Sequence, residues 1–135
     1  MKTWADKLDS GAPSQVKPAP INIAGMKAGE IMLVPTARQV DDFIRTLPKG
    51  THMEIRTLRQ RMAKQHGAEV TCPITMGFHL RTVAEAAFED FQRTGDISAV
   101  TPFWRVLDAS TPTISRLSFG TAFVTEQRLK EGLKD

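Results

Sequence analysis

Few side chains in this sequence are reactive, and only one of them is a thiol. Cys72 stands directly before Pro73 at the start of a helical pattern, where the positive end of a helix dipole would lower the pKa of the thiol. His66 and His79 lie nearby in the sequence, but the spacing assigns neither of them to Cys72 as a partner. A single cysteine excludes an internal disulfide, and no Cys/His cluster has zinc spacing. We expect no metal and no cofactor, and we favour a capping or semi-buried thiol over a nucleophile at Cys72.

The element that positions these groups is a long helix, predicted from Thr71-Cys72-Pro73 to a stop at Gly95. Its apolar residues recur every three or four positions and form one stripe: Gly77, Leu80, Ala84, Ala87, Phe88 and Phe91. At about 100° per residue, the opposite face collects hydroxyls, an imidazole and one aromatic ring. These residues are Thr71, Thr75, Phe78, His79 and Thr82. Such a face could contact a DNA groove, or it could be a solvated face with one exposed ring.

Two shorter helices are predicted before the long one. Thr36 and Gln39 have capping-box spacing and open the first, which buries Val40, Phe43, Ile44 and Leu47. Thr51 and Glu54 repeat that spacing and open the second, which buries Ile55, Leu58 and Met62 and ends at Gly67.

The second of these helices is the most basic segment of the chain. It carries Arg56, Arg59, Arg61 and Lys64, and we expect Arg56 and Arg59 to contact phosphates if the following helix enters a groove. Such charges can also simply keep a helix face soluble. The distal half of the long helix carries Glu85, Glu89 and Asp90, so only its first half could approach DNA without repulsion.

The remaining segments complete a single domain. Residues 1–20 are predicted to be a flexible leader, and residues 21–135 form the domain, beginning with a short strand before Pro35. Pro102-Phe103-Trp104-Arg105-Val106-Leu107 suits a buried strand, and residues 108–120 a wing-like loop. A last helix over residues 121–133 places Phe123, Val124 and Leu129 inside. This order predicts a mainly α fold with a small β component, a winged helix-turn-helix.

Composition limits the environment and the partners. The 135 residues are 41% hydrophobic and carry a formal charge of +3, which permits an anionic partner without requiring one. No apolar run approaches a membrane span, and residues 1–20 do not resemble a secretory signal. We expect a cytoplasmic protein with no membrane partner.

Several motifs together resemble the C-terminal domain of the O6-alkylguanine-DNA alkyltransferases and the related alkyltransferase-like proteins. Leu47-Pro48-Lys49-Gly50-Thr51 is similar to the family turn before the DNA-binding helix pair. Pro102-Phe103-Trp104-Arg105-Val106 falls where the family has Pro-Cys-His-Arg-Val, and Glu131-Gly132 resembles the end of its closing helix. Residues 67–75 look closest to a small bacterial subgroup of alkyltransferase-related proteins. The resemblance covers residues 35–132 and implies a winged-helix DNA-binding domain.

The departures from the family pattern bear on the chemistry. Phe103 stands in the place of the alkyl-accepting cysteine and Trp104 in that of the histidine that activates it, so the family's transfer reaction has no nucleophile here. The nucleotide-rotating tyrosine of the family falls near Ile55, and its arginine finger near Ile74 or Thr75. Pro102, Phe103, Trp104 and Arg105 would line or fill a vestigial pocket.

The sequence therefore predicts a non-catalytic, alkyltransferase-like protein that binds duplex DNA, with alkylated or distorted DNA as a candidate ligand. Three alternatives remain open. The same fold could serve as a protein-interaction module that has lost DNA binding, or as a transcription regulator. An enzyme that uses Cys72 is the least favoured of them.

Overall fold

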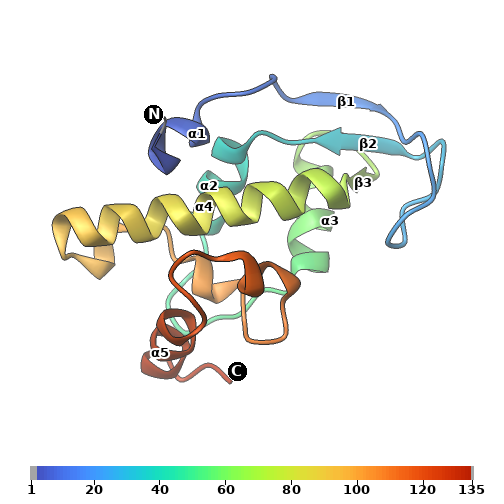
Figure 1. Ribbon diagram of the computed structural model, residues 1–135. Coiled ribbons are helices and arrows are strands. Elements are labelled where there is room, and N and C mark those ends of the chain that lie inside the picture. The colour runs from blue at the N-terminus through green and yellow to red at the C-terminus, as the bar shows by residue number, and fades with distance from the viewer. Residues whose placement is uncertain (1–2, 135) are drawn as a thin grey trace.

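Helix α4, Pro73–Thr94, runs through the middle of the molecule in the computed structural model, which describes residues 3–134 (Figure 1). The predicted helix is confirmed: Pro73 occupies its first turn, and Gly95, at a φ of 70°, caps its end in the left-handed conformation. Its 22 residues span roughly 33 Å. The predicted apolar stripe faces the core, and its fully buried members are Leu80, Ala84 and Ala87.

Helices α2, Ala37–Arg45, and α3, Ile55–Gln65, precede α4 as predicted. The capping box of α2 is present, because Thr36 and Gln39 each accept the backbone N–H of the other. The second predicted capping box is wrong: the N-cap of α3 is Glu54, and the Thr51 hydroxyl instead donates to the carbonyl of Pro48. Pro48-Lys49-Gly50 folds as a turn that extends to Thr51, and this turn delays the start of α3.

A three-stranded sheet covers the N-terminal end of α4 (Figure 1). Its order is β1, Gln15–Pro18, then β2, Ile31–Val34, then β3, Val70–Thr71, with an antiparallel first pair and a parallel second pair. Strand β2 confirms the predicted short strand. Its partner β3 leads directly into α4, and the N–H of Cys72 extends the pairing to the carbonyl of Leu33.

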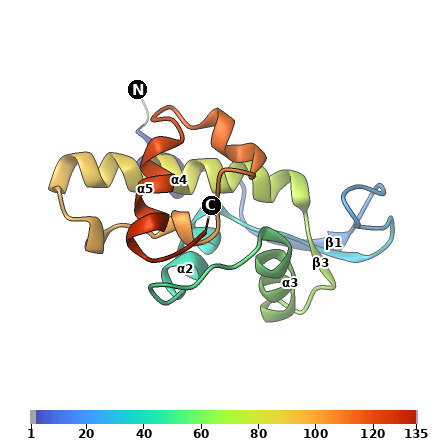
Figure 2. The same ribbon diagram turned by 90° about the horizontal axis from the view of Figure 1, so that it is seen from below.

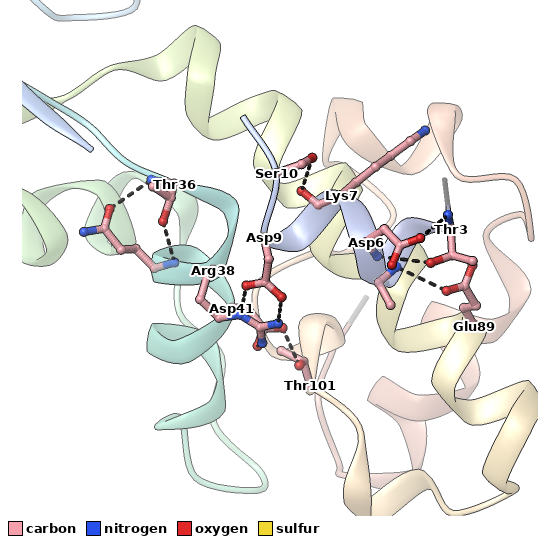
Figure 3. Close-up of polar contacts among 12 residues, drawn as sticks. Thr3, Asp6, Lys7, Asp9, Ser10, Thr36, Arg38, Asp41, Glu89 and Thr101 are labelled. Carbon is pink, nitrogen blue, oxygen red and sulfur yellow. Dashed lines mark hydrogen bonds and ion pairs between the residues drawn. The ribbon is translucent and has the colours of Figure 1, made fainter. Parts of the chain in front are cut away.

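The N-terminal segment is part of the fold, which corrects the prediction that residues 1–20 are a flexible leader. Helix α1, Trp4–Leu8, packs against α4 and buries Leu8. Its first N–H groups, those of Trp4 and Ala5, donate to the carboxylate of Glu89 on α4 (Figure 3). Asp9 then forms an ion pair of 2.7 Å with Arg38 on α2. Residues 1 and 2 lie outside the described residues.

The motif Pro102–Leu107 is buried as predicted but is not a strand. Residues Phe103–Arg105 form a 3-10 turn, η2, and the N–H groups of Val106 and Leu107 both donate to the carbonyl of Phe103. A second 3-10 turn, η1, Ile97–Ala99, precedes it. Local turn bonds thus satisfy a backbone that the pattern of large apolar residues assigned to a sheet.

The C-terminal third wraps beneath α4 (Figure 2). Within residues 108–120 the structure has a 3-10 helix, η3, Pro112–Arg116, and no strand, so this loop lacks the hairpin of a typical wing. Helix α5, Ala122–Lys130, buries Val124 and half-buries Phe123 as predicted. Leu129, predicted inside, is 75% exposed, because α5 buries the polar residues Gln127 and Arg128 instead.

The fold is therefore mainly helical, with a small three-stranded sheet in a single domain built on one large core and a small second cluster. The second cluster comprises Ala19, Met26, Met32 and Cys72. Within the part of the chain that the structure describes, no helix combines the length and apolar character needed to cross a bilayer.

Candidate functional site

The five residues predicted to face DNA do not share one exposed surface. Phe78 is 61% exposed, whereas Thr71 is buried and Thr75, His79 and Thr82 are only partly accessible. Thr71 is the last residue of β3 and not part of α4, so helical spacing does not govern its direction. The structure thus keeps Phe78 as an outward side chain and turns the others toward their neighbours.

Each of the partly accessible residues has an internal hydrogen bond. The His79 Nε2 lies 2.8 Å from the carbonyl of Pro35; burial lowers the pKa of the imidazole despite that contact. The Thr82 hydroxyl donates to the carbonyl of Phe78, and the Thr75 hydroxyl to the sulfur of Cys72. These side chains brace the first turns of α4 rather than present free polar groups.

Ile74 joins Phe78 in an apolar ridge that the sequence analysis did not identify. Ile74 is 48% exposed and lies one turn before Phe78 on the same helix. The two side chains border a groove of about 330 Å³ between α4 and η3, lined further by Pro112, Thr113 and Arg116. The four-residue spacing from Phe78 could have revealed Ile74, but Arg116 comes from a loop and reaches the groove only through the tertiary fold.

The acidic residues of the distal half of α4 are occupied within the protein. Glu85 is buried and accepts both the hydroxyl and the N–H of Ser118, at 2.5 and 3.0 Å. Glu89 caps α1, and Asp90 forms an ion pair of 3.0 Å with Arg93. Of the three, only Asp90 has a cationic partner; the groups that donate to Glu85 and Glu89 are neutral.

The segment of residues 102–105, which the resemblance aligns with the family's active site, is closed. Phe103 is fully buried and lies 5.4 to 6.0 Å, centroid to centroid, from the rings of Trp104, Phe119 and Phe123. Pro102 and Trp104 are also buried, and Arg105 is half-buried. The four residues predicted as a vestigial pocket thus fill the space with aromatic packing, although Pro102, Trp104 and Arg105 border a shallow cavity of about 160 Å³.

Glu131 ties this motif to two other segments on which the family resemblance rests. Its carboxylate accepts the indole N–H of Trp104 at 2.6 Å, the Nε of Arg105 at 2.9 Å and the N–H of Gly50 at 2.8 Å. Arg105 also donates to the carbonyl of Leu47 at 2.7 Å. The Leu47–Gly50 turn, the aromatic motif and the Glu-Gly end therefore meet in one polar cluster.

The charge of Glu131 is stabilised by these donors. Burial alone would raise its pKa, but Arg105, the N–H of Gly50 and the indole of Trp104 outweigh burial and hold the pKa below the ordinary value of 4.5. From the sequence, Glu131 is predicted only to lie at the end of the last helix. Its role as an acceptor depends on three segments that are distant in the chain.

Cys72 has no arrangement for nucleophilic catalysis. Its thiol is buried in the second cluster, where it accepts the hydroxyl of Thr75 at 3.3 Å. The ring of His79 is engaged at Pro35, and His66 is exposed at the end of α3. Within residues 3–134, no three His, Cys, Asp or Glu side chains are grouped closely enough to hold a metal ion.

The two arginines predicted at phosphates lie together on α3. Arg56 is exposed and Arg59 half-buried, and both line a small cavity beneath the tip of the loop between β1 and β2. Arg59 also holds β3 in place, because its Nε donates to the carbonyl of Thr71 and its own carbonyl accepts the Thr71 hydroxyl at 2.6 Å. Arg56 and Arg59 are thus close to the start of α4 but do not border the groove beside Phe78.

Comparisons of the chain with models of protein families, with curated proteins and with solved structures give no match in any of the three.

Proposed function

We propose that this protein is a non-catalytic, alkyltransferase-like protein that binds duplex DNA through the first half of α4. In this proposal α3 and α4 act as a helix-turn-helix of the winged-helix type, with residues 108–120 in the position of the wing. The observation that carries it is the apolar ridge of Ile74 and Phe78 beside Arg116. Exposed apolar side chains on a recognition element can wedge between base steps or stack on an unpaired base, and a neighbouring arginine can contact a phosphate.

Two further features support binding without alkyl transfer. The ion pair with Arg93 offsets the charge of Asp90 on the distal half of α4, which reduces the repulsion of a nucleic acid there. The burial of Phe103 against Trp104 leaves the family's acceptor position without a nucleophile. A ridge that senses distortion of the duplex is consistent with both features.

Fluorescence anisotropy on matched duplexes tests this function. We expect wild-type protein to bind a duplex containing O6-alkylguanine or a mismatch more tightly than a regular duplex, with affinity falling as salt rises. Replacement of Phe78 by Ala should weaken binding to the distorted duplex about tenfold, because one base-stacking contact is lost. Leu129→Ala is the matched control, since Leu129 is another exposed apolar residue and lies on α5, away from the groove.

Absence of wild-type binding to every duplex at low salt would exclude this proposal. The apolar character of the groove favours a protein partner as the second candidate, because Arg116 is the one charged residue among the described residues that line it. A partner held there would bind with little salt dependence and would lose affinity with Phe78→Ala.

A further inference from the structure

A second concave site lies on the other side of the α4 start, between α3 and the loop that connects β1 to β2. It is a cavity of about 80 Å³ lined by Arg56, Arg59 and Gln60 of α3, by Thr71 and by the loop tip at Gly25. No acidic residue is among the described residues that line it. Two guanidinium groups therefore share a small, partly enclosed space that has no negative charge of its own.

One hydrogen bond fixes the orientation of the Arg59 guanidinium group, and its terminal Nη atoms make no hydrogen bond to the described residues. Its Nε donates to the carbonyl of Thr71 at 3.2 Å, which anchors one edge of the guanidinium group. Its two Nη atoms have no acceptor within residues 3–134, and neither does any nitrogen of Arg56 or the side-chain amide of Gln60. Burial lowers the pKa of Arg59, and the like charge of Arg56 lowers it further. The Cys72 sulfur raises this pKa but does not offset the other two effects.

Four arginines elsewhere in the protein have carboxylate partners. Arg38, Arg45, Arg93 and Arg105 each form an ion pair, at distances between 2.7 and 3.4 Å. Arg59 is half-buried yet has no such partner among the described residues. An anion in the cavity would supply the missing acceptor and relieve the repulsion between the two guanidinium groups.

The opposite wall of the cavity is rigid. Ala24 and Gly25, at φ values of 48° and 85°, form a two-residue turn closed by reciprocal backbone bonds between Ile23 and Met26 at 2.9 and 2.8 Å. Met26 is buried in the second cluster, which anchors the turn against the sheet. The left-handed conformation of Ala24 is unfavourable for a residue with a Cβ atom, so its surroundings must hold it. The backbone N–H groups of Ala24 and Gly25 have no acceptor within residues 3–134.

We propose that this cavity binds one phosphate group, held by the guanidinium groups of Arg59 and Arg56 and the amide of Gln60. The forked donors of arginine match a tetrahedral oxyanion, and the small volume accepts a single phosphate rather than a nucleoside. The phosphate belongs either to a free phosphate or phosphomonoester, or to the backbone of a nucleic acid. The site stands on its own geometry and does not depend on DNA binding by the Ile74–Phe78 ridge.

Titration with inorganic phosphate, followed by ¹⁵N NMR at constant ionic strength with chloride as the balancing anion, tests the site. We expect saturable shifts at the Gly25 amide and at the Nε of Arg59.

Arg56→Gln should weaken phosphate binding about tenfold, since one charge-assisted contact is removed. Arg56 is exposed and makes no hydrogen bond or ion pair within the described residues, so this variant is expected to fold normally. Arg61→Gln, an exposed arginine of the same helix that does not line the cavity, is the matched control.

The absence of a saturable shift at Gly25 and Arg59 would overturn the proposal, as would equal phosphate affinity of Arg56→Gln and wild type. Titration with a short regular duplex then distinguishes the sources. Shifts of the same two signals identify a backbone phosphate, whereas phosphate-induced shifts without a duplex response identify a free phosphate or phosphomonoester. DNA binding by the Ile74–Phe78 ridge is tested independently, by the anisotropy experiment with Phe78→Ala.

Discussion

Glu131 shows how one carboxylate can connect segments that the chain keeps far apart. It accepts N–H groups from Gly50, Trp104 and Arg105, and side-chain exposures of 6% for Glu131 and 14% for Arg105 make their ion pair a largely buried one. Breaking a buried pair leaves the remaining charge without compensation. Glu131 is therefore a structural residue whose removal should be costly.

We expect Glu131→Gln to lower the free energy of unfolding by about 3 kcal/mol at neutral pH. Because folding lowers the pKa of Glu131, its contribution is complete above the ordinary value of 4.5 and is lost as the pH falls through the folded pKa. Urea unfolding across a pH series should show the gap between wild type and variant narrowing below that value. A gap that stays constant with pH would contradict this assignment.

Phe78 and Phe103 are two aromatic residues with opposite surroundings. Phe78 is 61% exposed on α4, whereas Phe103 is fully buried among three other rings. We expect Phe78→Ala to change the unfolding free energy by less than about 1 kcal/mol, and Phe103→Ala to lower it by about 3–5 kcal/mol. Thermal unfolding of both variants checks this contrast, and a large loss with Phe78→Ala would mean that the ridge is part of the core.

Among the elements, α1 depends most on tertiary contacts. Five residues are too few for an isolated helix, and α1 is held by the carboxylate of Glu89, the buried side chain of Leu8 and the ion pair between Asp9 and Arg38 (Figure 3). The same helix places Trp4 beneath Arg81, at 5.3 Å from the ring centroid. The N-terminal segment is therefore a packed layer on α4.

The packing of α1 predicts that Leu8→Ala lowers the free energy of unfolding by about 2 kcal/mol, the lower end for a buried Leu. Val16→Ala, at an exposed position of the same N-terminal segment, should have little effect. Urea denaturation of the two variants measures the difference. Equal stability of Leu8→Ala and wild type would restore the interpretation of residues 1–20 as a flexible leader.

Taken as a whole, the molecule lacks the parts of an alkyl acceptor. Under the family resemblance the acceptor position falls on Phe103, which is buried, and the thiol of Cys72 is buried in the second cluster at the start of α4. The nucleophile in such a transfer must be an accessible thiolate. Neither residue meets that requirement.

We therefore expect no methyl group to move from O6-methylguanine DNA to this protein. Intact-mass spectrometry after incubation should give the unmodified mass, and Cys72→Ser should behave identically. A stoichiometric gain of one methyl group that disappears in Cys72→Ser would show that the thiol is reactive after all.

The sequence by itself determined the features that depend on neighbours along the chain. The capping box of Thr36 and Gln39, the start of α4 at Pro73 and its stop at Gly95 are all local, since each is fixed by backbone geometry within a few residues. Helical periodicity likewise predicted the burial of Val40, Ile44 and Leu80 and the outward direction of Phe78.

Only the tertiary structure decided the features that need a distant partner. Residues 103–105 form a turn whose side chains are held by distant acceptors, Glu131 for Trp104 and Leu47 for Arg105, whereas their β propensity alone favoured a strand. Arg128 is buried and Leu129 exposed because Arg128 donates to the carbonyl of Trp104. The groove beside Phe78 and the cavity of Arg56 and Arg59 arise in the same way, because loops distant in sequence supply one wall of each.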